Sequence, residues 1–283
     1  MADLPSPAAT LPKQYLDLLE DALAFTLWPD PPMLVELSSY RRQSKLKWMI
    51  MAGLSKLASS CGCKLARMSP LTEAEVREGR SWRQYPDTMI GKLRLANIRA
   101  CMERALSDGV PGDFIETGAW RGGACIYMRG ILAAHGVAQR KIFVADSFEG
   151  LPMPDEEMYP ADKGDTHHLL KFLAVDLDSV KQNFARFGLL DEQVVFLKGW
   201  FKDTLPVAPI KKLAVMRLDG DMYGSTMDAF NSLYDRLSPG GYCIIDDYAL
   251  EGCRKAVDEF RASRSITAPL EVIDWTGRFW RKA

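Results

Sequence analysis

The sequence predicts an α/β fold in which a parallel sheet carries helices on both faces. From residue 112 onward, short runs rich in β-branched residues alternate with longer stretches that repeat apolar residues every three or four positions. This is the pattern of strands joined by helices. The last two runs are separated only by Thr276 and Gly277, too few residues for a crossover helix, so they predict an antiparallel hairpin. At 283 residues the chain can bury one large core.

Each predicted strand is a short apolar run. The five parallel strands are expected in DFIET, KIFVADS, VVFLKG, LAVMRLDGD and GYCIIDD, at residues 113–117, 141–147, 194–199, 213–221 and 241–247. The hairpin is expected in LEVIDW and GRFWRK, at 270–275 and 277–282. Helices are predicted at 124–136, 178–190 and 226–237.

This layout resembles the Rossmann-like class I methyltransferases that use S-adenosylmethionine (SAM). The resemblance implies a seven-stranded sheet of order 3-2-1-4-5-7-6 with the last strand antiparallel and helices on both faces. A dinucleotide dehydrogenase normally continues with a sixth parallel strand instead, so that class is disfavoured.

The N-terminal part of the chain differs. Residues 1–80 lack the alternation and are expected to form a helical extension, whereas residues 81–283 are expected to form the methyltransferase domain. A basic, apolar helix at 41–58 could be a lid, a dimer element or a contact with a membrane surface. A long amphipathic helix follows at 88–109, and its predicted buried stripe comprises Leu93, Leu95, Ile98, Met102 and Leu106.

The composition restricts the class of partner. Acidic and basic residues nearly cancel, with a formal net charge of -1, which argues against a nucleic-acid binder that relies on phosphate neutralisation. No secretory signal and no apolar run long enough to cross a bilayer is recognised, so a cytoplasmic location without stable membrane insertion is expected. The six cysteines lack the spacing of a disulfide framework, although Cys61 and Cys63 leave metal binding or oxidation open.

A glycine-rich turn after the first predicted strand is a candidate ligand site. ETGAWRGG places Glu116 and Gly118 at a strand-to-helix turn, where a ligand can approach the backbone and the N–H groups of a helix start. The dehydrogenase fingerprint G-x-G-x-x-G is absent, and Glu116 would repel a pyrophosphate but attract a cationic amino group. SAM carries such a group. The alternative is that the glycines only pack a helix against a strand.

Two further segments support nucleotide binding. Asp146, at the end of the second strand, occupies the position where nucleotide-binding sheets place an acid for the ribose hydroxyls; it could instead cap a turn. After the third strand, Gly199, Trp200 and Phe201 could form the wall of an adenine site, and ordinary packing is the alternative.

Four aspartates end two strands that should be neighbours. Asp219 and Asp221 are two residues apart and project to the same side of the fourth strand, and Asp246 and Asp247 end the fifth. Their mutual repulsion would be relieved by a divalent cation, and a set of oxygen ligands favours Mg²⁺, with Ca²⁺ or Mn²⁺ possible.

Helix capping is the other interpretation of these acids, and it accounts for one acid in each pair. For the helix after the fourth strand, Ser225 and Asp228 are expected to form an N-terminal cap that resembles a capping box, which leaves Asp221 available for other roles.

These segments together resemble the macrocin (TylF-like) O-methyltransferases, which methylate sugar hydroxyls of macrolides and related natural products. The resemblance covers residues 87–283 and is carried by TMIG, DFIETGAWRGGACIYMRG, VADSFEGLP, FLKGWFKDTLP, RLDGDMYGSTMDA and GGYCIIDDY in the same order. It implies a helical N-terminal lid, SAM as cofactor, a requirement for Mg²⁺ and a homo-oligomer.

The resemblance also assigns roles to residues. It implies that Asp219, Asp246 and Asp247 are metal ligands and that Asp221 is the general base, although the roles of Asp219 and Asp221 could be exchanged. The cofactor-pocket residues that it implies are Thr88, Met89, Ile90, Glu116, Gly118 and Ser147, beside Asp146.

The expected function is SAM- and Mg²⁺-dependent methylation of a hydroxyl, with a glycosylated small molecule as the expected acceptor. His167 and His168 could line the acceptor pocket or assist the proton transfer, and surface positions are the alternative for both. Tyr223 is a further candidate acceptor contact. A catechol-type O-methyltransferase is the nearest rival, because adjacent hydroxyls would chelate the same metal. A SAM-binding protein without turnover is the rival from another class.

Overall fold

The computed structural model describes residues 7–29, 33–35, 44–67, 71–80 and 85–283. The predicted boundary between residues 80 and 81 adjoins 81–84, which lie outside the described residues. The division into two parts therefore stays a prediction.

The described residues form a seven-stranded sheet of order β5-β4-β3-β6-β7-β9-β8. Its strands are β3 (Asp113–Thr117), β4 (Ile142–Asp146), β5 (Val194–Lys198), β6 (Leu213–Leu218), β7 (Leu237–Ile245), β8 (Glu271–Val272) and β9 (Arg278–Arg281). The first five pair in parallel and β9 is antiparallel to both β7 and β8. Numbered from β3, this is the predicted order 3-2-1-4-5-7-6, and the fold class is confirmed.

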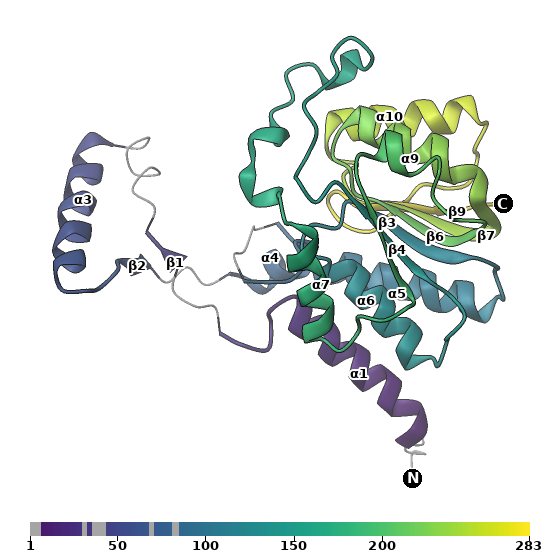
Figure 1. Ribbon diagram of the computed structural model, residues 1–283, viewed down its shortest axis with the longest axis horizontal. Coiled ribbons are helices and arrows are strands. Elements are labelled where there is room, and N and C mark those ends of the chain that lie inside the picture. Colours follow the sequence, from purple (N-terminus) through teal and green to yellow (C-terminus); the bar gives the residue numbers. More distant parts are fainter. Residues whose placement is uncertain (1–6, 30–32, 36–43, 68–70, 81–84) are drawn as a thin grey trace.

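Helices cover both faces of the sheet (Figure 1). The α-helices are α1 (Pro7–Leu23), α3 (Lys45–Ser60), α4 (Glu73–Glu78), α5 (Lys92–Ser107), α6 (Gly123–Ala134), α7 (Leu177–Arg186), α8 (Phe201–Thr204), α9 (Tyr223–Leu233) and α10 (Glu251–Ser263). Short 3-10 helices lie at η1 (Pro160–Asp162), η2 (His167–Leu169), η3 (Lys171–Leu173) and η4 (Tyr234–Arg236). One core lies beneath α1, α5, α6 and α7, and the other lies beneath α9 and α10.

Strand alternation decides which side chain enters which core. Phe114 and Val215 face the core under α5 and α6, whereas Ile115 and Met216 face the core under α9 and α10. Because side chains alternate along a strand, Glu116 and Arg217 project toward the core under α5 and α6, although both are charged.

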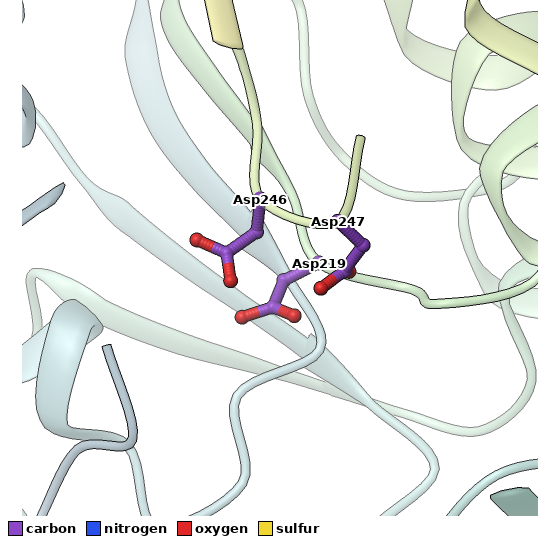
Figure 2. Close-up of side chains that lie close together, drawn as sticks. All are labelled: Asp219, Asp246 and Asp247. Carbon is purple, nitrogen blue, oxygen red and sulfur yellow. The ribbon is translucent and has the colours of Figure 1, made fainter. Parts of the chain in front are cut away.

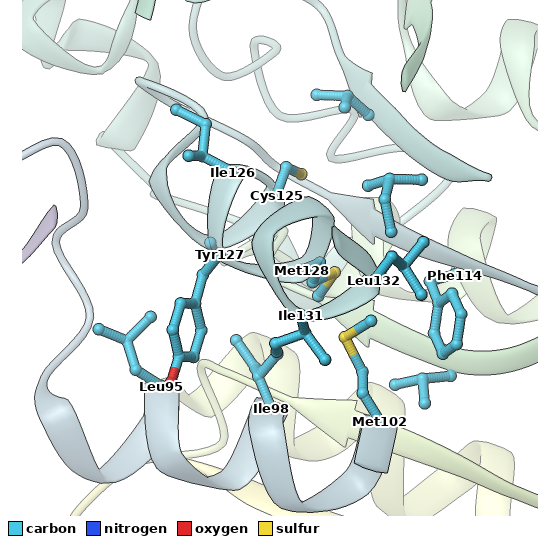
Figure 3. Packing of buried hydrophobic residues seen from close by; sticks show 14 of the residues in the cluster. Leu95, Ile98, Met102, Phe114, Cys125, Ile126, Tyr127, Met128, Ile131 and Leu132 are labelled. Carbon is cyan, nitrogen blue, oxygen red and sulfur yellow. The ribbon is translucent and has the colours of Figure 1, made fainter. Parts of the chain in front are cut away.

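Helix α5 packs against α6 through the stripe that its spacing predicts, with two differences. Leu95, Ile98 and Met102 are fully buried and meet apolar side chains of α6 (Figure 3). Leu93 and Leu106 are only half-buried, whereas Arg94 and Cys101 are buried in addition. Arg94 is buried, although it is charged, because its guanidinium group lies against Asp246 and Asp274.

Of the N-terminal helices, α1 packs against the core whereas α3 does not. Helix α1 packs against α6, with Leu16, Leu19 and Leu23 in the first core. Helix α3 has no buried residue and stands away from the sheet, beyond the antiparallel pair of β1 (Met33–Leu34) and β2 (Ala66–Arg67) (Figure 1). Among the helices described, none has the length and apolar character needed to span a membrane.

The C-terminal hairpin is looser than predicted. Val272 pairs with Arg278, so residues 273–277 form the connection rather than Thr276 and Gly277 alone. The reason is Asp274, which leaves the strand because its Oδ1 accepts hydrogen bonds from the N–H groups of Thr276, at 3.0 Å, and Gly277, at 2.7 Å.

Candidate active site

Three aspartates meet where β6 and β7 end. Leu218 pairs with Ile245 in the parallel ladder, so Asp219 and the pair Asp246 and Asp247 follow at the same edge of the sheet. One carboxylate oxygen from each of these aspartates lies within 4.8 Å of the others (Figure 2). The structure thus brings together the three residues predicted as metal ligands.

Asp221 lies beside this cluster in an unusual backbone conformation. Its φ of 56° is in the left-handed region, which aspartate tolerates better than most residues. Its N–H donates a hydrogen bond to Oδ2 of Asp247 at 3.1 Å. Burial raises the pKa of Asp221 to about 7, and the charge of Asp219 adds to this while His167 opposes it.

Two buried arginines face part of the cluster. Arg217, the residue before Leu218 in β6, contacts Glu116 and Asp246 and donates to Oδ2 of Asp219 at 2.8 Å. Arg94 from α5 contacts the second oxygen of Asp246. Sequence reasoning missed Arg94, because it lies 152 positions from Asp246 and its place in an amphipathic helix carried no signal.

The rest of the cluster keeps an excess of negative charge. Neither Asp221 nor Asp247 forms an ion pair with a cationic residue in the described part of the chain. Burial raises the pKa of Asp219 to about 6 and that of Asp247 well above its ordinary value, with repulsion from neighbouring aspartates adding in each case. Clustered oxygen donors with excess charge are the chemistry that a hard divalent cation requires, so these residues fit Mg²⁺.

A cavity opens next to the aspartates. Its lining includes the predicted residues Met89, Gly118, Asp146, Ser147, Gly199, Trp200 and Phe201, together with Asp219 and Asp221. A Cβ at Gly118 would lie 1.7 Å from the backbone oxygen of Asp219, and its φ is +92°. Only glycine fits at this position. The short distance also shows that the turn after β3 is in direct contact with the backbone of Asp219.

Asp146 is oriented within the cavity by backbone groups. Its Oδ2 accepts from the N–H groups of Ala119, at 2.7 Å, and Trp120, at 3.3 Å, and its Oδ1 accepts from the N–H of Phe148 at 2.7 Å. Burial raises its pKa, and these hydrogen bonds oppose the shift.

Three predicted cofactor residues lie outside the cavity lining. Thr88 and Ile90 are buried beside Met89, which does line the cavity. Glu116 is also buried, and its carboxylate contacts Arg217 and accepts a hydrogen bond from Sγ of Cys125 at 2.7 Å. In this structure the carboxylate of Glu116 therefore anchors Arg217.

The connection between β4 and α7 forms much of the cavity wall through residues that sequence reasoning missed. Met158, Tyr159 and Asp162 of this connection line the cavity, and so does Trp120 of the turn after β3. Residues 150–153 add a further part of this wall.

Asp162 also corrects the predicted start of α9. Its two oxygens accept from the N–H groups of Tyr223, at 2.7 Å, and Gly224, at 2.8 Å. The helix thus begins at Tyr223 and is capped by a residue from another segment, so the expected Ser225 and Asp228 cap is wrong. Asp228 instead accepts from the hydroxyl of Tyr159 at 2.8 Å.

The candidate acceptor residues lie around the cavity but outside its lining. Nδ1 of His167 lies 2.8 Å from Oδ2 of Asp165. Nδ1 of His168 is buried and finds no hydrogen-bond partner among the described residues. The hydroxyl of Tyr223 donates to Oε2 of Glu259 on α10, at 2.7 Å.

The strand order, the reversed β9 and the cavity at the carboxyl ends of the strands define a class I methyltransferase. The sequence model of the macrocin O-methyltransferase (TylF) family matches residues 12–282, and the chain belongs to this family of SAM-dependent methyltransferases. The protein is an O-methyltransferase.

Named relatives and solved structures agree with this assignment. The chain is 51% identical over 221 residues to mycinamicin III 3''-O-methyltransferase of Micromonospora griseorubida, covering 75% of this chain and 87% of the relative. It is 45% identical over 270 residues to demethyldecarbamoylnovobiocin O-methyltransferase of Streptomyces niveus, covering 95% and 93%. The structure of the O-methyltransferase NovP matches with a TM-score of 0.81 at 43% identity, covering 96% of this chain and 99% of that chain.

A third relative and a more distant structure extend the comparison. The 8-demethyl-8-(2,3-dimethoxy-alpha-L-rhamnosyl)-tetracenomycin-C 4'-O-methyltransferase of Streptomyces olivaceus is 53% identical over 204 residues, covering 72% of this chain and 78% of the relative. CalS11, a calicheamicin methyltransferase, matches with a TM-score of 0.53 at 19% identity over 84% of this chain and 93% of that chain, and this similarity concerns the fold.

Proposed function

We propose that this protein is a Mg²⁺-dependent enzyme that transfers the methyl group of SAM to a sugar hydroxyl of a glycosylated natural product. The observation that carries the proposal is the cluster of three carboxylates in contact with the cavity at the ends of β3 and β6. The names of the relatives, which include a mycinamicin and a rhamnosyl-tetracenomycin methyltransferase, support the acceptor class.

The cavity residues would bind SAM in one orientation. Asp146, which backbone N–H groups hold in place, would accept hydrogen bonds from the ribose hydroxyls. Trp200 and Phe201 would contact the adenine ring. Gly118 and Asp219 both line the cavity and lie against each other, so the reacting end of the cofactor would lie beside them.

The aspartates would carry the proton and charge chemistry. Asp219, Asp246 and Asp247 would hold the metal. When bound, SAM supplies the methyl group, and Mg²⁺ supplies positive charge that stabilises a developing alkoxide. Asp221 would accept the proton of the acceptor hydroxyl, because its raised pKa makes it a stronger base than an exposed aspartate.

His167 would assist the proton transfer. Asp165 accepts from the backbone N–H of His167 at 2.8 Å and also contacts its Nδ1, so the imidazole is held in one orientation. The charge of His167 opposes the rise in the pKa of Asp221, and this electrostatic influence supports a role for the imidazole beside the proposed base. His168 and Tyr223 remain proposed acceptor contacts.

Methyl transfer from labelled SAM to a sugar diol glycoside and to a catechol, measured in parallel, tests the proposal. We expect transfer to the glycoside, loss of transfer in EDTA and recovery when Mg²⁺ is added. The Asp219→Asn variant should lose turnover while SAM affinity, measured by calorimetry, stays within about twofold. Activity restricted to catechols would contradict the sugar acceptor, and turnover that survives both EDTA and Asp219→Asn would contradict the metal.

The wider expectations from the sequence stay predictions. These are a cytoplasmic location, a homo-oligomer, the absence of nucleic-acid binding, and an N-terminal extension in residues 1–80 that contributes a lid, acceptor contacts or subunit contacts.

A further inference from the structure

The guanidinium group of Arg94 reaches the aspartate cluster from a helix outside the strands that carry it. Arg94 lies in the first turn of α5, is 6% exposed, and its Nη1 contacts Oδ2 of Asp246. The other oxygen of Asp246 contacts Nη2 of Arg217. Asp246 is therefore held on both oxygens, which fixes the orientation of its carboxylate.

Arg94 is itself anchored by the C-terminal hairpin. Its Nε lies 3.0 Å from Oδ2 of Asp274, a side chain with no exposed surface. The other oxygen of Asp274 accepts the N–H groups of residues 276 and 277. This ion pair is thus tied to the backbone of the hairpin, and it limits the positions that the Arg94 side chain can adopt.

The C-terminal end of helix α4 packs against another side of the Arg94 side chain. A Cβ at Gly79 would lie 2.7 Å from Nη2 of Arg94 and 2.4 Å from the backbone N of Gly91, so the end of α4 is pressed against the start of α5. The indole Nε1 of Trp275 donates to the backbone oxygen of Glu78 at 2.9 Å. Arg94 therefore lies where α4, α5 and the hairpin meet.

We infer that Arg94, anchored by Asp274, is a positioning residue that orients Asp246 for metal binding. The inference rests on the proposed metal site. Each carboxylate oxygen can accept one hydrogen bond and still offer a second lone pair to a metal ion, so Arg94 and a cation need not compete for Asp246. Residues that orient a metal ligand in this way typically change metal affinity by about 10- to 100-fold when they are replaced.

The test measures Mn²⁺ binding to the metal-free full-length protein by calorimetry. In Arg94→Lys, which keeps the charge but loses the planar fork, we expect the Kd for Mn²⁺ to rise about tenfold or more. Asp274→Asn, which keeps Arg94 but weakens its anchor, should raise the Kd by a smaller factor. SAM affinity should stay within about twofold in both, and saturating Mg²⁺ should restore most of the turnover, which a general structural defect would not allow.

Arg129→Lys is the matched control. Arg129 is similarly buried, and its Nη2 lies 2.6 Å from Oδ2 of Asp191, away from the cavity lining. Its replacement should leave the Kd for Mn²⁺ unchanged.

Three results would overturn the inference. An unchanged Kd in both Arg94→Lys and Asp274→Asn would show that Arg94 does not position Asp246. Tighter Mn²⁺ binding would show that Arg94 only competes with the cation. Failure of the unaltered protein to bind Mn²⁺ would overturn the proposed metal site, and this inference with it.

Discussion

The backbone N–H of Asp221 donates a hydrogen bond to Oδ2 of Asp247 across 3.1 Å, which links the chain after β6 to the chain after β7. The bond fixes Asp221 in a left-handed conformation, with φ at 56°. The predicted general base is therefore held in place by one of the predicted metal ligands.

The Asp221→Asn variant removes the proposed basic carboxylate but keeps the backbone conformation. Asparagine also tolerates the left-handed region, so the fold and SAM affinity should be kept while kcat falls about 100-fold or more, as expected when a general base is lost. Single-turnover methyl transfer measures the loss, and circular dichroism checks the fold. A fall in kcat of less than tenfold would rule out Asp221 as the base.

Asp247→Asn should stabilise the metal-free protein at high pH. The pKa of Asp247 is raised in the folded state, so the folded protein binds more protons than the unfolded chain above pH 4, and the free energy of unfolding falls as pH rises. Asparagine removes this effect. In EDTA at pH 8 the variant should be more stable by about 1–3 kcal/mol, with no gain near pH 3. Urea denaturation at several pH values measures this, and a variant that is less stable at pH 8 would contradict it.

His167→Asn should lower kcat about tenfold or more and leave SAM affinity unchanged, because the imidazole that Asp165 orients would no longer assist proton transfer. Asp165→Asn should cause a smaller loss, since the imidazole remains but loses its anionic partner. His135→Asn is the control, because His135 pairs with Glu103 outside the cavity lining. Equal activity of His167→Asn and the unaltered protein would remove His167 from the mechanism.

Asp162→Ala tests the link between the cavity wall and α9. Loss of a capping carboxylate costs about 1–2 kcal/mol of folding stability, and here the wall should also loosen, so the KM for the acceptor should rise. Asp176→Ala is the matched control: Asp176 caps α7 by accepting from the N–H of Ser179 at 2.9 Å, outside the cavity lining. It should lose its helix cap with no change in KM. A parallel rise in KM in both variants would contradict a specific role for Asp162.

Capping illustrates why some local predictions were wrong. Ser225 and Asp228 have the spacing of a cap, but the carboxylate of Asp162 accepts the hydrogen bonds of the first two N–H groups of α9. A charged acceptor at a helix start is favoured over a hydroxyl when the fold brings it there. Likewise, Asp274 was expected within a strand, but it leaves the strand because its side chain has partners in the connection and on α5.

The sequence by itself determined the succession of strands and helices, the final hairpin and the two pairs of aspartates that end the fourth and fifth strands, because these follow from the spacing of apolar and acidic residues. The order of the strands in the sheet, which makes those two strands neighbours, was implied by the resemblance to class I methyltransferases. Only the tertiary structure decided which charges meet: Arg94 with Asp246, Glu116 with Arg217 and Asp162 with the start of α9. Such pairs join residues far apart in the chain, and local patterns cannot determine them because they depend on how helices and connections pack around the finished sheet.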